Sequence, residues 1–95
     1  MTDVRIHTVG HILDGKYKDW YVFIQTNRRS SSYLILKANN ITFGRDDDGN
    51  LIEGSLGYDS WMPDMLSVEY HFELNFPNIE WLDDQKLKWI PNHAD

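Results

Sequence analysis

The sequence predicts an α+β fold, in which an antiparallel β-sheet meander of five or six strands carries one α-helix, at about residues 64–76, on one face. Two patterns predict this fold: short apolar runs separated by turn residues as far as residue 52, and one longer segment with helical periodicity. A chain of 95 residues is expected to form a single domain over residues 1–95. Hydrophobic residues make up 41% of the chain and aromatic residues 14%, which is too apolar for a disordered acidic tail.

The first two strands are predicted from an alternating segment and a continuous apolar run. Residues 4–8 alternate apolar and polar side chains, as in a strand with one solvated face. Asp14-Gly15 then predicts a hairpin turn, because glycine adopts without steric cost the positive φ angle that a type I′ turn requires. Residues 19–25 contain a Trp-Tyr-Val-Phe-Ile run, which predicts a strand buried on both faces.

Two further strands are predicted before residue 53. The polar segment 28–32 has no period and is expected to be a loop, and the apolar residues 33–36 predict the third strand. Residues 41–43 begin a predicted fourth strand. Turn-forming residues at 48–50 are expected to direct that strand back through residues 51–52.

The segment from Asp64 to Phe76 fits both a strand and a helix, and its ends favour the helix. Alternating apolar residues fit a strand of unusual length for a small domain. One stripe of a helix over the same segment would hold Met65, Val68, Phe72 and Phe76. Asp64 is a suitable N-cap, and Pro77 ends a helix because it has no N–H to donate. We therefore expect a helix, then a short strand over residues 79–82 and a tail that docks by Trp89.

The charge pattern is the strongest indication of function. Between Asp46 and Gln85 the chain carries eleven carboxylates and no lysine or arginine, whereas the first 45 residues carry seven basic and three acidic side chains. Such an imbalance indicates association with a charged partner. Aromatic residues lie among these acids, at Tyr58, Trp61, Tyr70 and Trp81. In an interface, aromatic side chains supply buried area and carboxylates steer the encounter.

One segment resembles part of many small bacterial proteins. Asp59-Ser60-Trp61, the cap at Asp64, a helix that ends in residues 73–76 and a following Trp81 are similar to a pattern in which a capped helix packs on an antiparallel sheet. Several families of polymorphic-toxin immunity proteins have a similar size, acidity and build. The resemblance covers about a quarter of the chain, which departs from it by Pro63 and by the lack of alanine in the helix. It implies the sheet-plus-helix fold and assigns no functional residue.

No motif for a catalytic, cofactor or metal site is found. A calcium-binding loop that began at Asp46 would require glycine where Leu51 stands. His7 and His11 lie on one predicted strand, about 13 Å apart at roughly 3.3 Å per residue, which is too far to share a zinc ion. Ser30–Ser32 lack the glycines of a nucleophile elbow. We therefore expect no catalytic residue, metal or cofactor, and no enzyme activity.

These observations predict a small acidic, cytoplasmic binding protein. We expect an immunity protein that neutralises a basic toxin nuclease, because carboxylates can replace phosphates in the nucleic-acid-binding cleft of the toxin. The predicted partner-binding residues are Asp46, Asp47, Asp48, Glu53, Asp59, Glu69 and Glu73, with Tyr58 and Trp61 as anchors. The alternatives are a phage-type DNA mimic that inhibits a host defence enzyme, and a small hydrolase or ligand-binding enzyme. Binding to nucleic acid or to a membrane is not expected, and the oligomeric state is left open.

Overall fold

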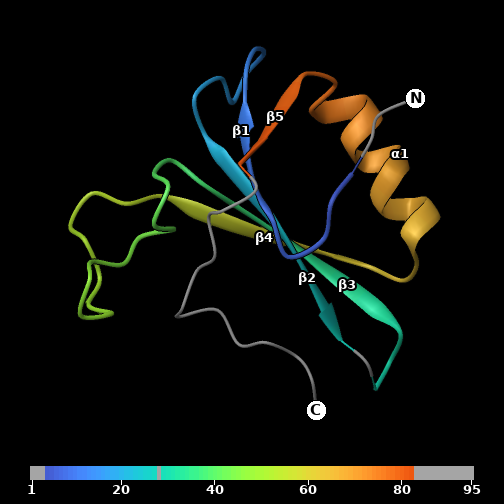
Figure 1. Cartoon of the computed structure of the whole chain (residues 1–95), viewed down its shortest axis with the longest axis horizontal. Coiled ribbons are helices and arrows are strands. Elements are labelled where there is room, and N and C mark those ends of the chain that lie inside the picture. The colour runs from blue at the N-terminus through green and yellow to red at the C-terminus, as the bar shows by residue number, and fades with distance from the viewer. Residues whose placement is uncertain (1–3, 28, 83–95) are drawn as a thin grey trace.

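The sheet of this protein has five antiparallel strands and carries one helix (Figure 1). The computed structural model describes residues 4–27 and 29–82. Its elements are β1 Val9–Ile12, β2 Tyr21–Asn27, β3 Ser32–Ala38, β4 Gly57–Met62, α1 Met65–Asn75 and β5 Ile79–Leu82. The predicted α+β fold with one helix packed on the sheet is therefore confirmed.

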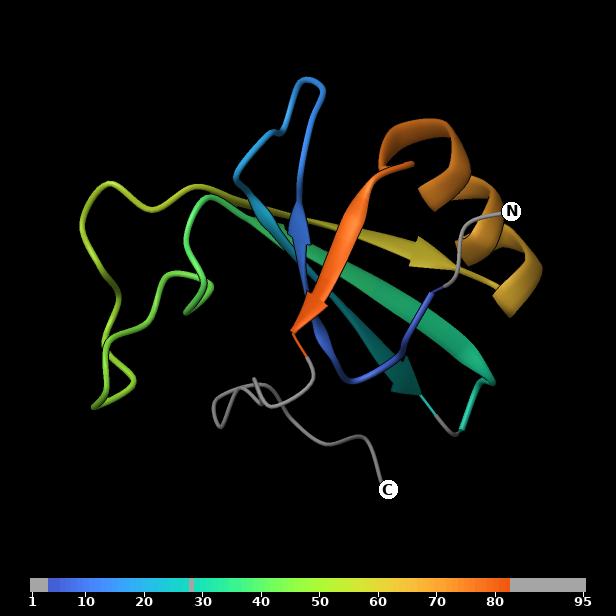
Figure 2. The same ribbon diagram turned by 45° about the horizontal axis from the view of Figure 1, so that its top comes forward.

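The strand order is β4-β3-β2-β1-β5, so the helix connects one edge strand of the sheet, β4, to the other, β5. The first four strands form the predicted meander. The chain then passes through α1 to the opposite edge, where β5 pairs with β1. Figure 2 shows β4 running from the long β3–β4 loop (residues 39–56) toward α1. The two ends of β4 therefore join the two parts of the molecule that carry most of its exposed acids.

One face of the sheet packs against the helix and forms the main core. Val22 and Ile24 of β2 point toward α1, and Ile24 lies opposite Ile35 of β3 in the register. Val68 and Phe72 of the helix are fully buried against them. The predicted burial of the second strand on both faces is confirmed, since Phe23 points to the other face and is 5% exposed. The ring of Phe43 in the β3–β4 loop covers Phe23, with the ring centroids 6.3 Å apart.

The helix begins and ends where the sequence predicts. Asp64 is the N-cap, and its side chain accepts a hydrogen bond of 2.8 Å from the Ser67 N–H. That backbone hydrogen bond, followed by one from the Ser67 side chain, lowers the pKa of Asp64. At the other end Phe76 leaves the helical conformation, and its N–H donates to the Phe72 carbonyl. The short strand predicted after the helix is confirmed as β5, whereas Trp89 lies outside the described residues.

The strand predicted over residues 4–8 is wrong, because β1 begins only at Val9. His7 adopts a φ angle of 57°, which bends the chain and interrupts the alternation. Its N–H still donates to the Ile24 carbonyl, so this segment stays beside β2. The type I′ hairpin predicted at Asp14-Gly15 is also wrong: Gly15 has a φ of 86° but Asp14 does not have a positive φ, and the β1–β2 connection is longer than a two-residue hairpin.

The strand predicted over residues 41–43 and 51–52 is also wrong, apart from a single bridge between Arg45 and Leu51. The Asn40 side chain explains the difference. Its Oδ1 accepts hydrogen bonds from the Gly44 N–H at 2.8 Å and from the Thr42 hydroxyl at 2.9 Å. This side chain closes a turn that competes with extended backbone. The fourth strand is instead β4, a segment for which no strand was predicted.

Within the described residues, no helix has the length and apolar content needed to cross a membrane.

Candidate protein-binding surface

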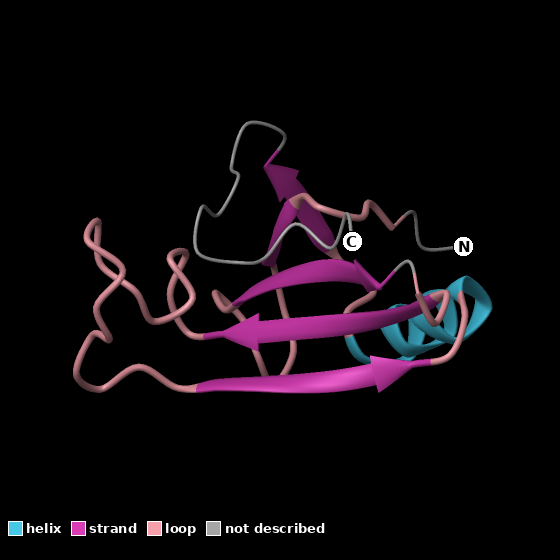
Figure 3. Ribbon diagram, turned by 90° about the horizontal axis from the view of Figure 1, so that it is seen from below, coloured by secondary structure: helices cyan, strands magenta, loops and turns pink. Residues whose placement is uncertain are grey.

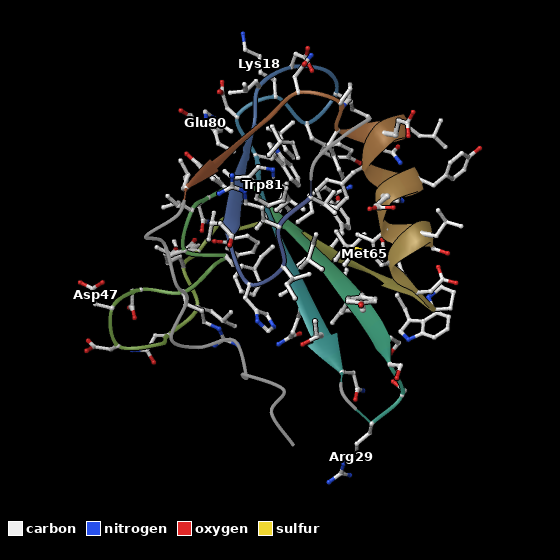
Figure 4. All side chains as sticks on the ribbon, turned by 45° about the vertical axis from the view of Figure 1, so that its right-hand side comes forward. Lys18, Arg29, Asp47, Met65, Glu80 and Trp81 are labelled. Carbon is white, nitrogen blue, oxygen red and sulfur yellow. The ribbon has the colours of Figure 1, made fainter. Side chains whose placement is uncertain are left out.

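The nine side chains predicted to contact a partner occupy three separate places. Asp46, Asp47, Asp48 and Glu53 lie on the β3–β4 loop; Tyr58, Asp59 and Trp61 lie on β4; Glu69 and Glu73 lie on α1. Figures 1 and 3 show the loop and the helix at opposite ends of the long strands. Figure 4 likewise shows Asp47 far across the sheet from Met65 of the helix. The predicted acids therefore lie on the loop, on β4 and on the helix, and they do not form one continuous acidic surface.

One acid of the β3–β4 loop, Asp46, is engaged with its own turn. The Oδ1 atom of Asp46 accepts hydrogen bonds of 2.9 Å from the N–H groups of both Asp48 and Asn50. The Arg45 guanidinium donates to the Gly49 carbonyl at 3.0 Å and places a positive charge inside the cluster. A nearby cation reduces the potential that a distant partner meets. The Asp46 carboxylate is thus held within its own turn, whereas the other three acids of the loop are exposed.

The acids of α1 border an exposed apolar stripe. Leu66, Tyr70 and Leu74 follow one another at four-residue spacing and are 74%, 64% and 63% exposed. We call these three residues the α1 stripe. Val68 and Phe72 on the other side of the helix are buried, so the stripe faces away from the sheet. Glu69 and Glu73 lie along one flank of the stripe, and α1 contains no lysine or arginine.

The two aromatic anchors predicted on β4 point to opposite faces. Tyr58 lies on the helix side, where its ring stacks on Trp20 at 6.0 Å between centroids. Trp61 lies on the other face together with Asp59, because side chains alternate along a strand. Tyr58 is 55% exposed and Trp61 is 63% exposed, so both are accessible. They cannot anchor the same flat surface.

Lys37 of β3 was not singled out from the sequence, yet it organises the helix side of the sheet. Its Nζ lies 3.6 Å from the centroid of the Tyr17 ring and 5.5 Å from those of both Tyr58 and Phe76. Such contacts are favourable because the face of an aromatic ring is electronegative. They also place this cation among aromatic rings beside the helix C-terminus. No local pattern could have identified it, since the rings come from three different segments.

His71 is the titratable group of the helix that faces this cluster. Burial lowers the pKa of His71, and the nearby charge of Lys37 lowers it further. The ring contacts Phe76, with the centroids 5.6 Å apart. A histidine with a lowered pKa is neutral at pH 7, so it adds no positive charge beside Glu69 and Glu73.

His11 forms the second feature that was not predicted. Its Nε2 lies 3.1 Å from Asp19 Oδ1, its Nδ1 lies 3.8 Å from Glu80 Oε1, and its ring stacks on Tyr21. The arrangement joins β1, β2 and β5 at the edge opposite β4. It is the nearest approach to an acid–base pair. It does not line either of the two hollows described below, so it does not support a hydrolase site.

Two hollows lie beside β4. An open groove of about 610 Å³ is lined by residues that include Leu36, Phe43, Gly57 and Asp59. A smaller hollow of about 140 Å³ lies beside Trp61 and Leu34. Across the described part of the chain, no group of three or more histidine, aspartate or glutamate side chains is arranged to hold a metal ion.

No family model matches this chain, and no curated protein or solved structure is significantly similar to it.

Proposed function

We propose that this protein is a small acidic inhibitor that binds a basic protein, in the way that an immunity protein binds its toxin nuclease. The observation that carries the proposal is the α1 stripe with its flanking carboxylates. Three large apolar side chains stand exposed on one helix face, and Glu69 and Glu73 lie beside them on a helix that contains no lysine or arginine. Exposed apolar residues that are grouped and bordered by polar ones are typical of protein interaction sites.

Charge supports a basic partner. Glu69 and Glu73 are four residues apart on the helix, and such like-charged neighbours destabilise a helix by a few tenths of a kcal/mol. Within the described residues no ion pair relieves either of them. Lysine or arginine side chains of a partner would remove this repulsion and gain hydrogen bonds to the carboxylates.

The proposed mechanism is occlusion of the nucleic-acid-binding cleft in the cytoplasm. The glutamates take the positions of substrate phosphates against basic residues of the cleft, while Tyr70 is buried and slows dissociation. The loop acids add only a long-range attraction, which salt screens over about 8–10 Å. A DNA mimic needs its carboxylates along one face, so their division between loop and helix counts against that alternative.

The test is genetic. We expect a toxin gene beside the gene for this protein. Deleting the latter should stop growth of the source organism, and the deletion should be harmless when that toxin gene is deleted as well. The wild-type gene should restore growth, and Tyr70→Arg should not, because it places a cation against the basic partner. Leu51→Arg is the matched control, since Leu51 is 75% exposed but lies on the loop. A deletion that is harmless in every strain, or full rescue by Tyr70→Arg, would refute the proposal.

A further inference from the structure

Within the described part of the chain, no strand pairs with the outer edge of β4. In the described sheet β4 pairs only with β3. The Asn39 N–H donates to the Leu56 carbonyl at 3.0 Å, so residue 56 turns its main chain toward β3. Antiparallel ladders alternate from one residue to the next. The N–H and C=O groups of Gly57, Asp59 and Trp61 therefore point away from β3.

Of the features that usually protect an edge strand, this edge has only one, the charged side chain of Asp59. Proteins block edges with lysine, proline, bulges or very short strands. β4 is six residues long, contains no lysine, arginine or proline, and follows a regular register against β3. The opposite edge differs, because β5 is only four residues long. An edge of this length with so little protection is a template for an added strand.

The side chains of β4 indicate what such a strand would carry. Asp59 supplies the only charge on the edge, and it points to the face opposite α1. Gly57 lies on that same face and has no side chain, which leaves the groove beside Leu36 and Phe43 open toward the edge. An added antiparallel strand would therefore place a cation opposite Asp59. Two residues further along the added strand, a large apolar side chain would lie over Gly57.

We propose that β4 accepts an extended, cationic segment of the partner as a sixth strand, antiparallel to β4. The inference rests on the proposed function for the basic character of the partner, and it adds the binding mode. Charge favours such a segment over a second copy of this chain. Each copy carries a net charge of −6, and self-pairing centred on Asp59 would place two aspartates opposite each other.

The probe is a short, blocked peptide of β-branched residues that carries an arginine and, two positions later, a phenylalanine. Binding is followed by NMR of the ¹⁵N-labelled full chain at low ionic strength. We expect shifts and slowed hydrogen exchange at the amides of Gly57, Asp59 and Trp61. The same peptide with glutamate in place of arginine should bind at least fivefold more weakly, because like-charged cross-strand neighbours repel.

Two substitutions of Asp59 distinguish the contribution of its charge to peptide binding from the contribution of its main-chain N–H. Asp59→Asn keeps the outward N–H and should weaken the arginine peptide about two- to fivefold. Asp59→Pro removes that N–H, which the fold does not use, and should weaken it about tenfold further. Circular dichroism and the melting temperature establish that both variants remain folded.

Three outcomes would overturn the inference. Equal binding by the Asn and Pro variants would show that no main-chain bond forms at residue 59. Protected amides on this edge in the free monomer would show that it is already paired, and self-association through it would identify a second copy as the occupant. The peptide assay needs no toxin. If the peptide binds but the wild-type gene does not restore growth in the genetic test, only the proposed function is refuted. Growth rescue by Asp59→Pro together with failure of the peptide would refute only strand addition.

Discussion

The β3–β4 loop and the helix α1 are both acidic and both expose leucines, but one of the loop carboxylates is held in its own turn, whereas neither helix glutamate has a partner within the described residues. Asp46 of the loop receives two N–H groups of its own turn, and Arg45 stands inside the same cluster. Glu69 and Glu73 of the helix have no such neighbours in the described structure. The number of carboxylates in a segment is therefore a poor measure of its ability to bind a cationic partner. That ability depends on the hydrogen bonds and the cations around each carboxylate.

The largest expected difference between the two regions is in stability. Phe72→Ala removes a fully buried ring from the core and should lower the free energy of unfolding by about 3–5 kcal/mol. Leu51→Ala on the loop should change it by less than about 0.5 kcal/mol. Urea unfolding followed by circular dichroism measures both values. Equal effects would mean that the loop shares the helix core.

The second-largest change in stability is expected at Lys37, because its side chain connects the end of the helix to the sheet. Lys37→Met keeps the aliphatic stem but loses the contact of the cation with the Tyr17 ring, and it should cost about 1–2 kcal/mol. Lys37→Arg should retain part of the contact, and Lys18→Met, at an exposed position, should have no measurable effect. If Lys37→Met is as stable as wild type, the aromatic cluster does not need its cation.

The regions that the sequence predicted correctly are those governed by local patterns. The apolar run of β2 and the cap at Asp64 each act within one element, so their outcomes follow from neighbouring residues. The strand predicted over residues 41–52 failed because the Asn40 side chain closes a turn. β4 was missed because its outer face carries only Gly57, Asp59 and Trp61, which gives no apolar alternation.

The candidate site was predictable in composition and not in arrangement. Glu69 and Glu73 were named from the sequence, and their helix is present. Leu66 and Leu74 were not named, because an exposed leucine and a buried one look alike until the packing of the helix is known. The Lys37 cluster depends on rings from three segments, so only the three-dimensional fold brings it together.

Lowering the pH should destabilise the folded protein through His71 of the helix. Its pKa is lowered in the folded state, so the unfolded state binds more protons once the pH falls below the ordinary value of 6.5. Stability should therefore be complete above pH 6.5 and decline as the pH falls through the folded pKa. His71→Gln should remove this decline between pH 7 and pH 5, as measured by thermal unfolding. A wild-type melting temperature that is constant over this range would contradict the prediction.

The N-cap gives a smaller effect that appears at lower pH. The pKa of Asp64 is lowered by the Ser67 N–H, so its contribution is present above the ordinary value of 3.8 and is lost as the pH falls through the folded pKa. Asp64→Ala should lower the melting temperature at pH 7, and Asp64→Ser should restore most of it. The difference between wild type and Asp64→Ala should vanish in strong acid. Asp46→Ala should leave the helix signal in circular dichroism unchanged, because Asp46 caps only its own loop.

The smallest expected effect is on the association rate, and it distinguishes long-range electrostatic steering from direct contact with the partner. With the partner identified by the growth test, Asp47→Asn combined with Asp48→Asn should lower the association rate less than about threefold, and only at low salt, since exposed charges are screened. Glu69→Gln combined with Glu73→Gln should instead raise the dissociation rate at every salt concentration, because the proposed interface places those carboxylates in direct contact with the partner. Stopped-flow association and surface plasmon resonance dissociation measure the two rates. A dissociation rate that responds to the loop pair and not to the helix pair would move the interface from α1 to the β3–β4 loop.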